Sequence, residues 1–196
     1  MGDPERPGTP VASWLTPRAG STPAPPALIG DDFAAERLHA AWHTRGTSPE
    51  HLVLQTGGGR LTLAAHPDGA LLQPLNGSLQ SIEVSVLATS DAAASFVVSD
   101  ASTRELTISA DASGRTRAEI ITHTASNTDA LLITEDLPPE SRIGVRLKGD
   151  HMHFTLNGNE VGTPSPLTGR RWTGAEWGLA ARGTGTATFG AVEVTA

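Results

Sequence analysis

Four side chains suited to polar recognition lie close together in the second half of the sequence. His151 and His153 are two residues apart, and Arg142 and Arg146 precede them. Because side chains two apart on a strand point to the same face, we expect both imidazoles to share one surface with the two guanidinium groups. Such a surface suits hydroxyl-rich or anionic ligands better than metal cations, since the arginine charges repel a cation.

Tryptophan is the second candidate for sugar contact, because the C–H face of a sugar ring packs well on an indole. Trp42 and Trp177 stand in apolar patterns and are expected in the core, where indoles are common. Trp172 follows Arg170 and Arg171 just before a glycine turn, so we expect it to be exposed. The candidate ligand-binding residues are therefore Arg142, Arg146, His151, His153 and Trp172.

No motif indicates that this chain is an enzyme by itself. A jelly-roll glycosidase needs two carboxylates about 5–10 Å apart across a cleft. The E-x-D-x-x-E pattern that supplies them is absent, and so is the G-x-S-x-G motif of serine hydrolases. Cysteine is also absent, which excludes thiol chemistry. We therefore predict no catalytic residue.

The residues around the histidines and arginines alternate with period two, which predicts strands. Apolar residues at 143, 145 and 147 alternate with the arginines, and those at 152, 154 and 156 alternate with the histidines. The tight turn at 148–150 predicts that the two runs pair antiparallel. Similar runs bounded by glycine turns recur along the chain. The pattern predicts about ten to twelve strands, at most one helical turn around 34–41, and an all-β fold, a two-sheet antiparallel jelly-roll sandwich.

The apolar positions of these strands form the predicted core. It comprises Phe33, Trp42, Leu61, Leu63, Ile82, Val84, Val86, Phe96, Val98, Leu106, Ile108, Val145, Leu147, Phe154, Leu156, Leu179 and Val194. Residues 1–30 differ, since they hold seven of the 14 prolines, which cannot join a regular ladder. We predict a disordered, proline-rich linker at 1–30 and one β-sandwich domain at 31–196.

Charge and hydropathy exclude other classes of partner. The formal net charge is −7, from 14 Lys and Arg against 21 Asp and Glu, which argues against binding to nucleic acid or an anionic membrane. The sequence has no apolar run long enough to span a bilayer. It has no signal peptide, so we expect a cytoplasmic protein if Met1 is the native start.

Several short motifs carry a resemblance to a known family. They are Asp31-Asp32-Phe33 followed by Leu38 and Trp42, Leu52-Val53-Leu54 followed by residues 59–63, the segment 142–158, and Trp172–Ala175 with Gly178-Leu179. Together they resemble the concanavalin A-like β-sandwich domain at the C-terminus of glycoside hydrolase family 43 enzymes, the β-xylosidases and arabinofuranosidases.

The resemblance implies a non-catalytic accessory domain of an enzyme that cleaves O-glycosyl bonds in xylan- or arabinan-type substrates. Its expected partner is a carbohydrate or an adjacent glycosidase catalytic domain. Two alternatives stay open. The chain could be a free-standing, lectin-like sugar-binding module, or a small jelly-roll glycosidase or lyase that acts alone.

The resemblance also implies a structural calcium ion, held in part by the opening aspartates. Asp31 and Asp32 are the candidate ligands. Gly190 stands where family members carry a further aspartate, and the loss of a carboxylate weakens a calcium site, which needs six to eight oxygens. The alternative is that the aspartates accept hydrogen bonds from nearby backbone N–H groups at the start of the first strand. No other cofactor is expected.

Overall fold

The computed structural model describes residues 30–75, 79–99, 104–111, 113, 115–122, 128–136, 140–166 and 175–195. The predicted linker lies outside these residues except for Gly30, so the domain boundary stays a prediction. The strands are β1 (His43–Arg45), β2 (Val53–Gly57), β3 (Arg60–Ala64), β4 (Ala70–Pro74), β5 (Ser81–Ser99), β6 (Arg104–Ala110), β7 (Arg115–Thr122), β8 (Thr128–Asp136), β9 (Arg142–Lys148), β10 (His151–Leu156), β11 (Asn159–Pro166) and β12 (Glu176–Thr195). One helical turn, α1 (Pro49–Leu52), lies between β1 and β2.

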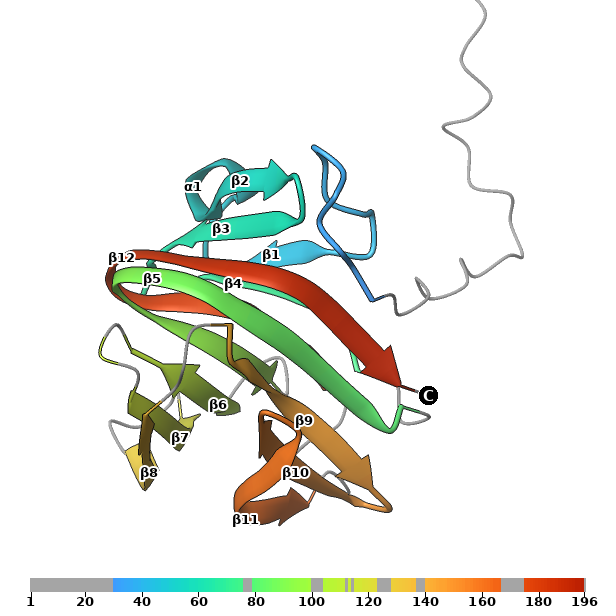
Figure 1. Cartoon of the computed structure of the whole chain (residues 1–196), viewed down its shortest axis with the longest axis vertical. Coiled ribbons are helices and arrows are strands. Elements are labelled where there is room, and N and C mark those ends of the chain that lie inside the picture. The colour runs from blue at the N-terminus through green and yellow to red at the C-terminus, as the bar shows by residue number, and fades with distance from the viewer. Residues whose placement is uncertain are drawn as a thin grey trace, which may run out of the picture.

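Two long strands, β5 and β12, organise the molecule, and Figure 1 shows them side by side along one arch. The second half of β5 and the first half of β12 belong to a sheet with the order β1-β4-β12-β5-β6-β7-β8. Their other halves belong to a sheet with the order β2-β3-β12-β5-β9-β10-β11. Every pairing is antiparallel. The predicted two-sheet jelly-roll sandwich is therefore confirmed.

The bend that carries β5 and β12 between the sheets has a local cause. The pairing register shifts between Gly183 and Thr186 of β12, opposite Asp91 of β5. Gly183 has a φ of 105° and Asp91 a φ of 53°, both in the left-handed region. Glycine adopts this conformation without a steric penalty, so Gly183 lets β12 turn where an ordinary residue would strain the backbone.

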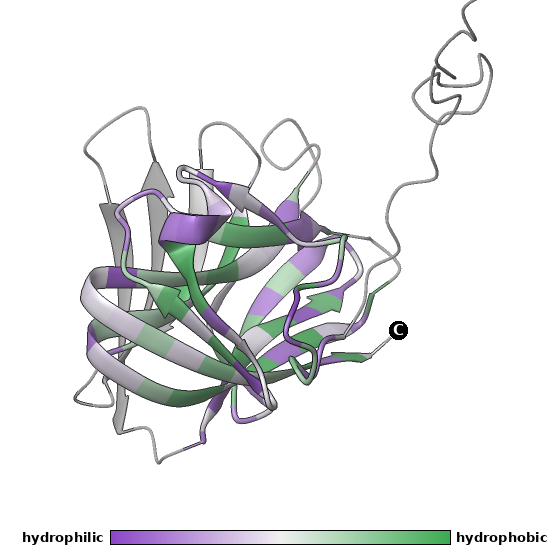
Figure 2. Ribbon diagram, turned by 90° about the horizontal axis from the view of Figure 1, so that it is seen from above, coloured by the Kyte–Doolittle hydropathy of each residue, from purple (hydrophilic) through white to green (hydrophobic). Residues whose placement is uncertain are grey.

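The core lies between the two sheets and follows the alternation of the sequence (Figure 2). The predicted core residues that are buried are Phe33, Trp42, Leu61, Leu63, Ile82, Val84, Phe96, Val98, Ile108, Val145, Phe154, Leu156 and Leu179. Val86, Leu147 and Val194 are partly buried and pack against this core. The side chain of Leu106 lies outside what the structure describes. The period-two pattern thus identified the inward faces of both sheets.

A column of four aromatic rings runs through the core. Phe33 contacts Trp42 at 6.1 Å between ring centroids, Trp42 meets Trp177 edge-on at 5.3 Å, and Trp177 stacks on Phe96 at 5.6 Å. The prediction that Trp42 and Trp177 lie in the core is confirmed. Phe33 and Trp42 precede β1, Trp177 lies on β12 and Phe96 on β5, so the column packs the opening segment against both long strands.

The expected position of the helical turn was wrong. Residues 35–37 form a bend and residues 40–41 a turn, which is closed by a hydrogen bond from the Trp42 N–H to the His39 carbonyl. The one helical turn in the described part of the chain begins at Pro49, whose fixed φ suits the first turn of a helix. This turn is too short to span a membrane, and no other helix among the described residues could do so.

Replacement of Phe154 with alanine should test the packing between the sheets. The Phe154 side chain is 6% exposed and belongs to the core cluster, so the truncation leaves a cavity. We expect the free energy of unfolding in urea to fall by about 3–5 kcal/mol. A loss under about 1 kcal/mol would place Phe154 on the surface and contradict the packing.

Candidate functional site

The candidate site begins with the hairpin of β9 and β10. The two strands pair antiparallel, with His153 opposite Arg146 and His151 opposite Lys148. Gly149 in the connecting turn has a φ of 59°, which glycine adopts freely. The antiparallel hairpin that the turn at 148–150 predicts is therefore present.

The two faces of this hairpin have opposite characters. The side chains of Ile143, Val145, Met152, Phe154 and Leu156 are buried in the core. Because neighbouring side chains alternate across a strand, the predicted donors Arg142, Arg146, His151 and His153 lie together on the outer face of the sheet. The structure thus brings these four side chains to one surface.

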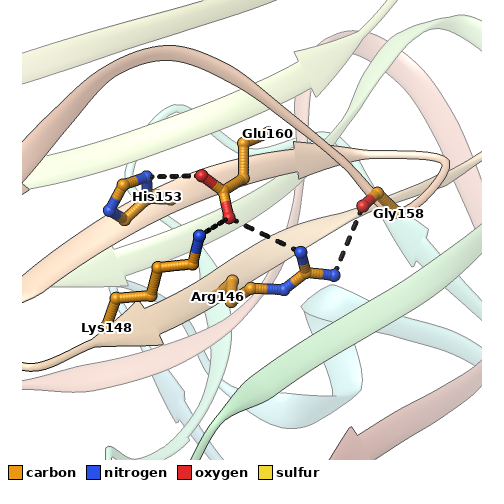
Figure 3. Close-up of polar contacts among 5 residues, drawn as sticks. All are labelled: Arg146, Lys148, His153, Gly158 and Glu160. Carbon is orange, nitrogen blue, oxygen red and sulfur yellow. Dashed lines mark hydrogen bonds and ion pairs between the residues drawn. The ribbon is translucent and has the colours of Figure 1, made fainter.

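Glu160 is the centre of that surface, and the sequence did not identify it. It lies on β11, opposite Thr155 of β10. Its Oε1 lies 2.5 Å from Lys148 Nζ and 3.5 Å from Arg146, and its Oε2 lies 2.9 Å from His153 Nδ1 (Figure 3). We call Arg146, Lys148, His153 and Glu160 the Glu160 cluster. The Asn157-Gly158 turn was the available signal, since it folds β11 back beside β10.

The Glu160 cluster holds its carboxylate in the ionised form. The hydrogen bond from Lys148 lowers the pKa of Glu160 below its ordinary value of 4.5. Partial burial opposes this shift, while the charges of Lys148, His153 and Arg146 reinforce it. The Glu160 side chain is 30% exposed, so the cluster is open to solvent and to a ligand.

The other predicted donors have acidic partners of their own. Arg142 pairs with Glu193 of β12 at 2.5 Å, and its backbone N–H donates to the Asn157 side chain. His151 Nδ1 lies 2.7 Å from Asp150 Oδ1. The surface is therefore a set of exposed ion pairs rather than a groove of free donors. Trp172, the fifth candidate, lies outside the described residues.

Two buried polar atoms beside the cluster have no hydrogen-bond partner within the described residues. They are Thr155 Oγ1 and Glu83 Oε1. The register places Glu83 and Thr155 on either side of Gly144. A Cβ at Gly144 would lie 2.0 Å from the carbonyl oxygen of Ile82, so the close approach of β9 to β5 requires glycine. The outer face thus keeps unused hydrogen-bonding capacity next to the ion pairs.

Asp31 and Asp32 have clear structural roles. Asp31 Oδ1 accepts the Phe33 N–H at 2.8 Å, and its Oδ2 accepts the indole N–H of Trp42 at 2.8 Å. Asp32 Oδ1 accepts the Ala34 N–H at 2.9 Å. Within the described ranges, no group of three or more His, Cys, Asp or Glu side chains is arranged to hold a metal ion. Both oxygens of Asp31 thus have protein donors, and calcium binding at Asp31 and Asp32 stays a prediction.

Comparison with known proteins places the fold. Neither a protein-family model nor a curated protein matches the sequence. The structure is similar to a xylan β-1,4-xylosidase from Bacillus halodurans, with a TM-score of 0.64 and 20% identity over 92% of this chain and 41% of the xylosidase. It is also similar to a Bacillus licheniformis β-glucanase, with a TM-score of 0.60 and 10% identity over 86% of this chain and 97% of the glucanase.

A laminarinase from Flavobacterium shows the same likeness, with a TM-score of 0.61 and 11% identity over 86% of this chain and 99% of the laminarinase. At such identities the likeness shows the fold. The sequence-based resemblance to a concanavalin A-like β-sandwich is therefore confirmed as a fold shared with glycoside hydrolases. The chain spans less than half the length of the xylosidase that it matches.

Replacement of Asp31 with alanine should separate the structural role of this residue from calcium binding. The change removes a carboxylate that accepts two hydrogen bonds, so the free energy of unfolding should fall by about 1.5–3 kcal/mol. The exposed Asp32 is the matched control, and its alanine variant should lose under about 1 kcal/mol. A rise in melting temperature when Ca²⁺ is added to the EDTA-treated wild type, absent in Asp31→Ala, would establish the calcium site. An Asp31→Ala variant as stable as the wild type would contradict the structural role.

The lowered pKa of Glu160 predicts a pH-dependent contribution to stability. Ionised Glu160 is favoured in the folded state, so its contribution is present above pH 4.5 and is lost as the pH falls through the lowered folded pKa. The stability difference between wild type and Glu160→Gln should therefore shrink as the pH falls below 4.5. Urea unfolding at a series of pH values measures it. A difference that stays constant with pH would show that the ion pairs do not hold in solution.

Proposed function

We propose that this chain is a non-catalytic, carbohydrate-associated β-sandwich domain that works beside a glycoside hydrolase catalytic domain on xylan- or arabinan-type substrates. The observation that carries the proposal is the likeness to the xylan β-1,4-xylosidase, of which the matched region is only 41%. More than half of that xylosidase lies outside the matched region and can supply the catalytic groups. The absence of a paired-carboxylate motif from the whole sequence agrees with an accessory role.

The outer face of the β9–β11 strands supports contact with a sugar or a neighbouring domain. Its charged side chains are partly exposed, from 19% for His153 to 56% for Lys148. Exposed ion pairs contribute little to stability, typically about 0–1 kcal/mol. A ligand can therefore exchange them for its own hydrogen bonds at small cost, and we place the proposed contact on this face.

A second function has one observation in its favour. The Bacillus licheniformis β-glucanase matches over 97% of its own length, so this fold can form a whole glycosidase. A lone jelly-roll glycosidase would need two facing carboxylates, and the sequence has no E-x-D-x-x-E pattern to supply them. Turnover by the purified chain is the outcome that would favour this second function.

The purified chain should bind xylo- or arabino-oligosaccharides without cleaving them. We expect the ring protons of His151 and His153 to shift in NMR spectra with an affinity in about the millimolar range. Chromatography of the same samples should show unchanged oligosaccharides. Maltotetraose serves as the control sugar and should leave the resonances in place. Hydrolysis, or unmoved resonances with every xylan and arabinan oligomer, would contradict the proposal.

A further inference from the structure

We infer that the Glu160 cluster is a carboxylate-recognition site for an acidic sugar, namely a uronic acid unit carried on the oligosaccharide. The inference rests on the proposed carbohydrate association and names the substrate class of that same surface. The inference has three requirements. The cluster must carry more positive than negative charge, and its cationic side chains must be exposed to a ligand. Glu160 must also find another hydrogen-bond partner when those side chains turn away from it.

The surplus of charge follows from the contacts. Arg146 and Lys148 carry two permanent positive charges, and Glu160 is the one carboxylate that either contacts within the described residues. His153 adds a third donor to the same carboxylate. The cluster is therefore positive by at least one charge, although the whole chain has a net charge of −7. One carboxylate from a ligand would neutralise it.

Arg146 is the loosely held donor of the cluster, whereas Lys148 and His153 lie 2.5 Å and 2.9 Å from Glu160. Arg146 lies 3.5 Å from Glu160 Oε1 and 3.3 Å from the Gly158 carbonyl oxygen, both beyond the usual range for an N–H···O bond. The side chains of Arg146 and Lys148 are 38% and 56% exposed. A guanidinium group matches a carboxylate with two parallel hydrogen bonds, which a neutral sugar hydroxyl cannot offer.

The surrounding acids and hydroxyls favour the exchange. Asp150 and Glu193 are engaged by His151 and Arg142, so they do not compete for the cluster. Thr155 lies directly opposite Glu160, fully buried, and its Oγ1 has no hydrogen-bond partner among the described residues. When Lys148 and Arg146 turn to a ligand carboxylate, Glu160 can accept the Thr155 hydroxyl. The exchange thus satisfies a group that is unpaired without ligand.

The test compares a xylo-oligosaccharide that carries one glucuronic acid side group with its methyl ester, which differs only by one added methyl group and carries no charge. Lys148 is the only lysine in the sequence, so its ¹³Cε resonance in ¹³C-lysine-labelled protein reports on this site alone. We expect about tenfold tighter binding of the acid than of the ester, as the loss of a charge-assisted hydrogen bond implies. The preference should shrink in 0.5 M salt, where surface charges are screened over about 4 Å.

Variants separate recognition from a structural role. Arg146→Gln and Lys148→Gln should lose the preference for the acid and keep the affinity for the ester. Binding to Lys148→Gln, which contains no lysine, is followed by the ring protons of His151 and His153. Arg60→Gln removes the same charge from an exposed position on β3 and should keep the preference. Glu160→Gln should bind the acid more tightly, because the ligand no longer competes with the resident carboxylate. A purely structural Glu160 would give weaker or unchanged binding. Melting curves of each variant check that it is folded. Because Lys148 is more exposed than Arg146, its substitution should disturb the fold less.

The outcomes distinguish this inference from the proposed function. Equal affinity for acid and ester, unchanged in the variants, would overturn acidic-sugar recognition and leave carbohydrate association intact. Failure of every oligosaccharide to bind would overturn both. A Lys148 resonance that shifts equally with inorganic phosphate and with the acid would show general anion binding and also overturn the inference.

Discussion

The hydrogen bond from the indole of Trp42 to Asp31 fixes the segment before β1, and the packing of the aromatic core depends on it. It orients Trp42 edge-on to Trp177, which in turn stacks on Phe96. These last two rings belong to β12 and β5, the strands shared by both sheets. A polar contact at the edge of the core therefore aligns the aromatic column that joins the opening segment to the centre of the sandwich. The opening segment therefore needs its aspartate and its two aromatic residues at once, because together they dock it onto β12 and β5.

The candidate site depends on the same two strands through their register. The first residues of β5 pair with β9, β9 pairs with β10, and β10 pairs with β11. Gly144 permits the close approach of β9 to β5, because a Cβ there would clash with the Ile82 carbonyl oxygen. The position of Glu160 relative to Arg146 and His153 therefore follows from the pairing of β9, β10 and β11. Glu160 lies on the third strand from β5. The surface acts as one unit because its charges sit on consecutive strands of a single sheet.

The sequence predicts the fold well because burial imposes a period of two on every strand, and the core residues follow from it. It also predicts that Arg146 and His153 share the outer face, since both alternate with apolar residues on two strands that pair antiparallel. It does not reveal Glu160, because Asn159–Pro166 lacks clear alternation and its pairing with β10 contains an irregularity between Met152 and Phe154. The pairing of Arg142 with Glu193 joins residues far apart in the chain. Such contacts require the register of several strands at once, which no local pattern contains.

The central position of β12 has a consequence for how the protein is made. This strand is the last in the described chain, yet it lies between β4 and β5 in one sheet and between β3 and β5 in the other. During synthesis, every earlier strand leaves the ribosome before the strand that joins them. The edges of β3, β4 and β5 then stay unpaired, and open strand edges are templates for aggregation. Synthesis of β12 is therefore the step that allows the sandwich to close, and these strand edges stay exposed on the nascent chain until that moment.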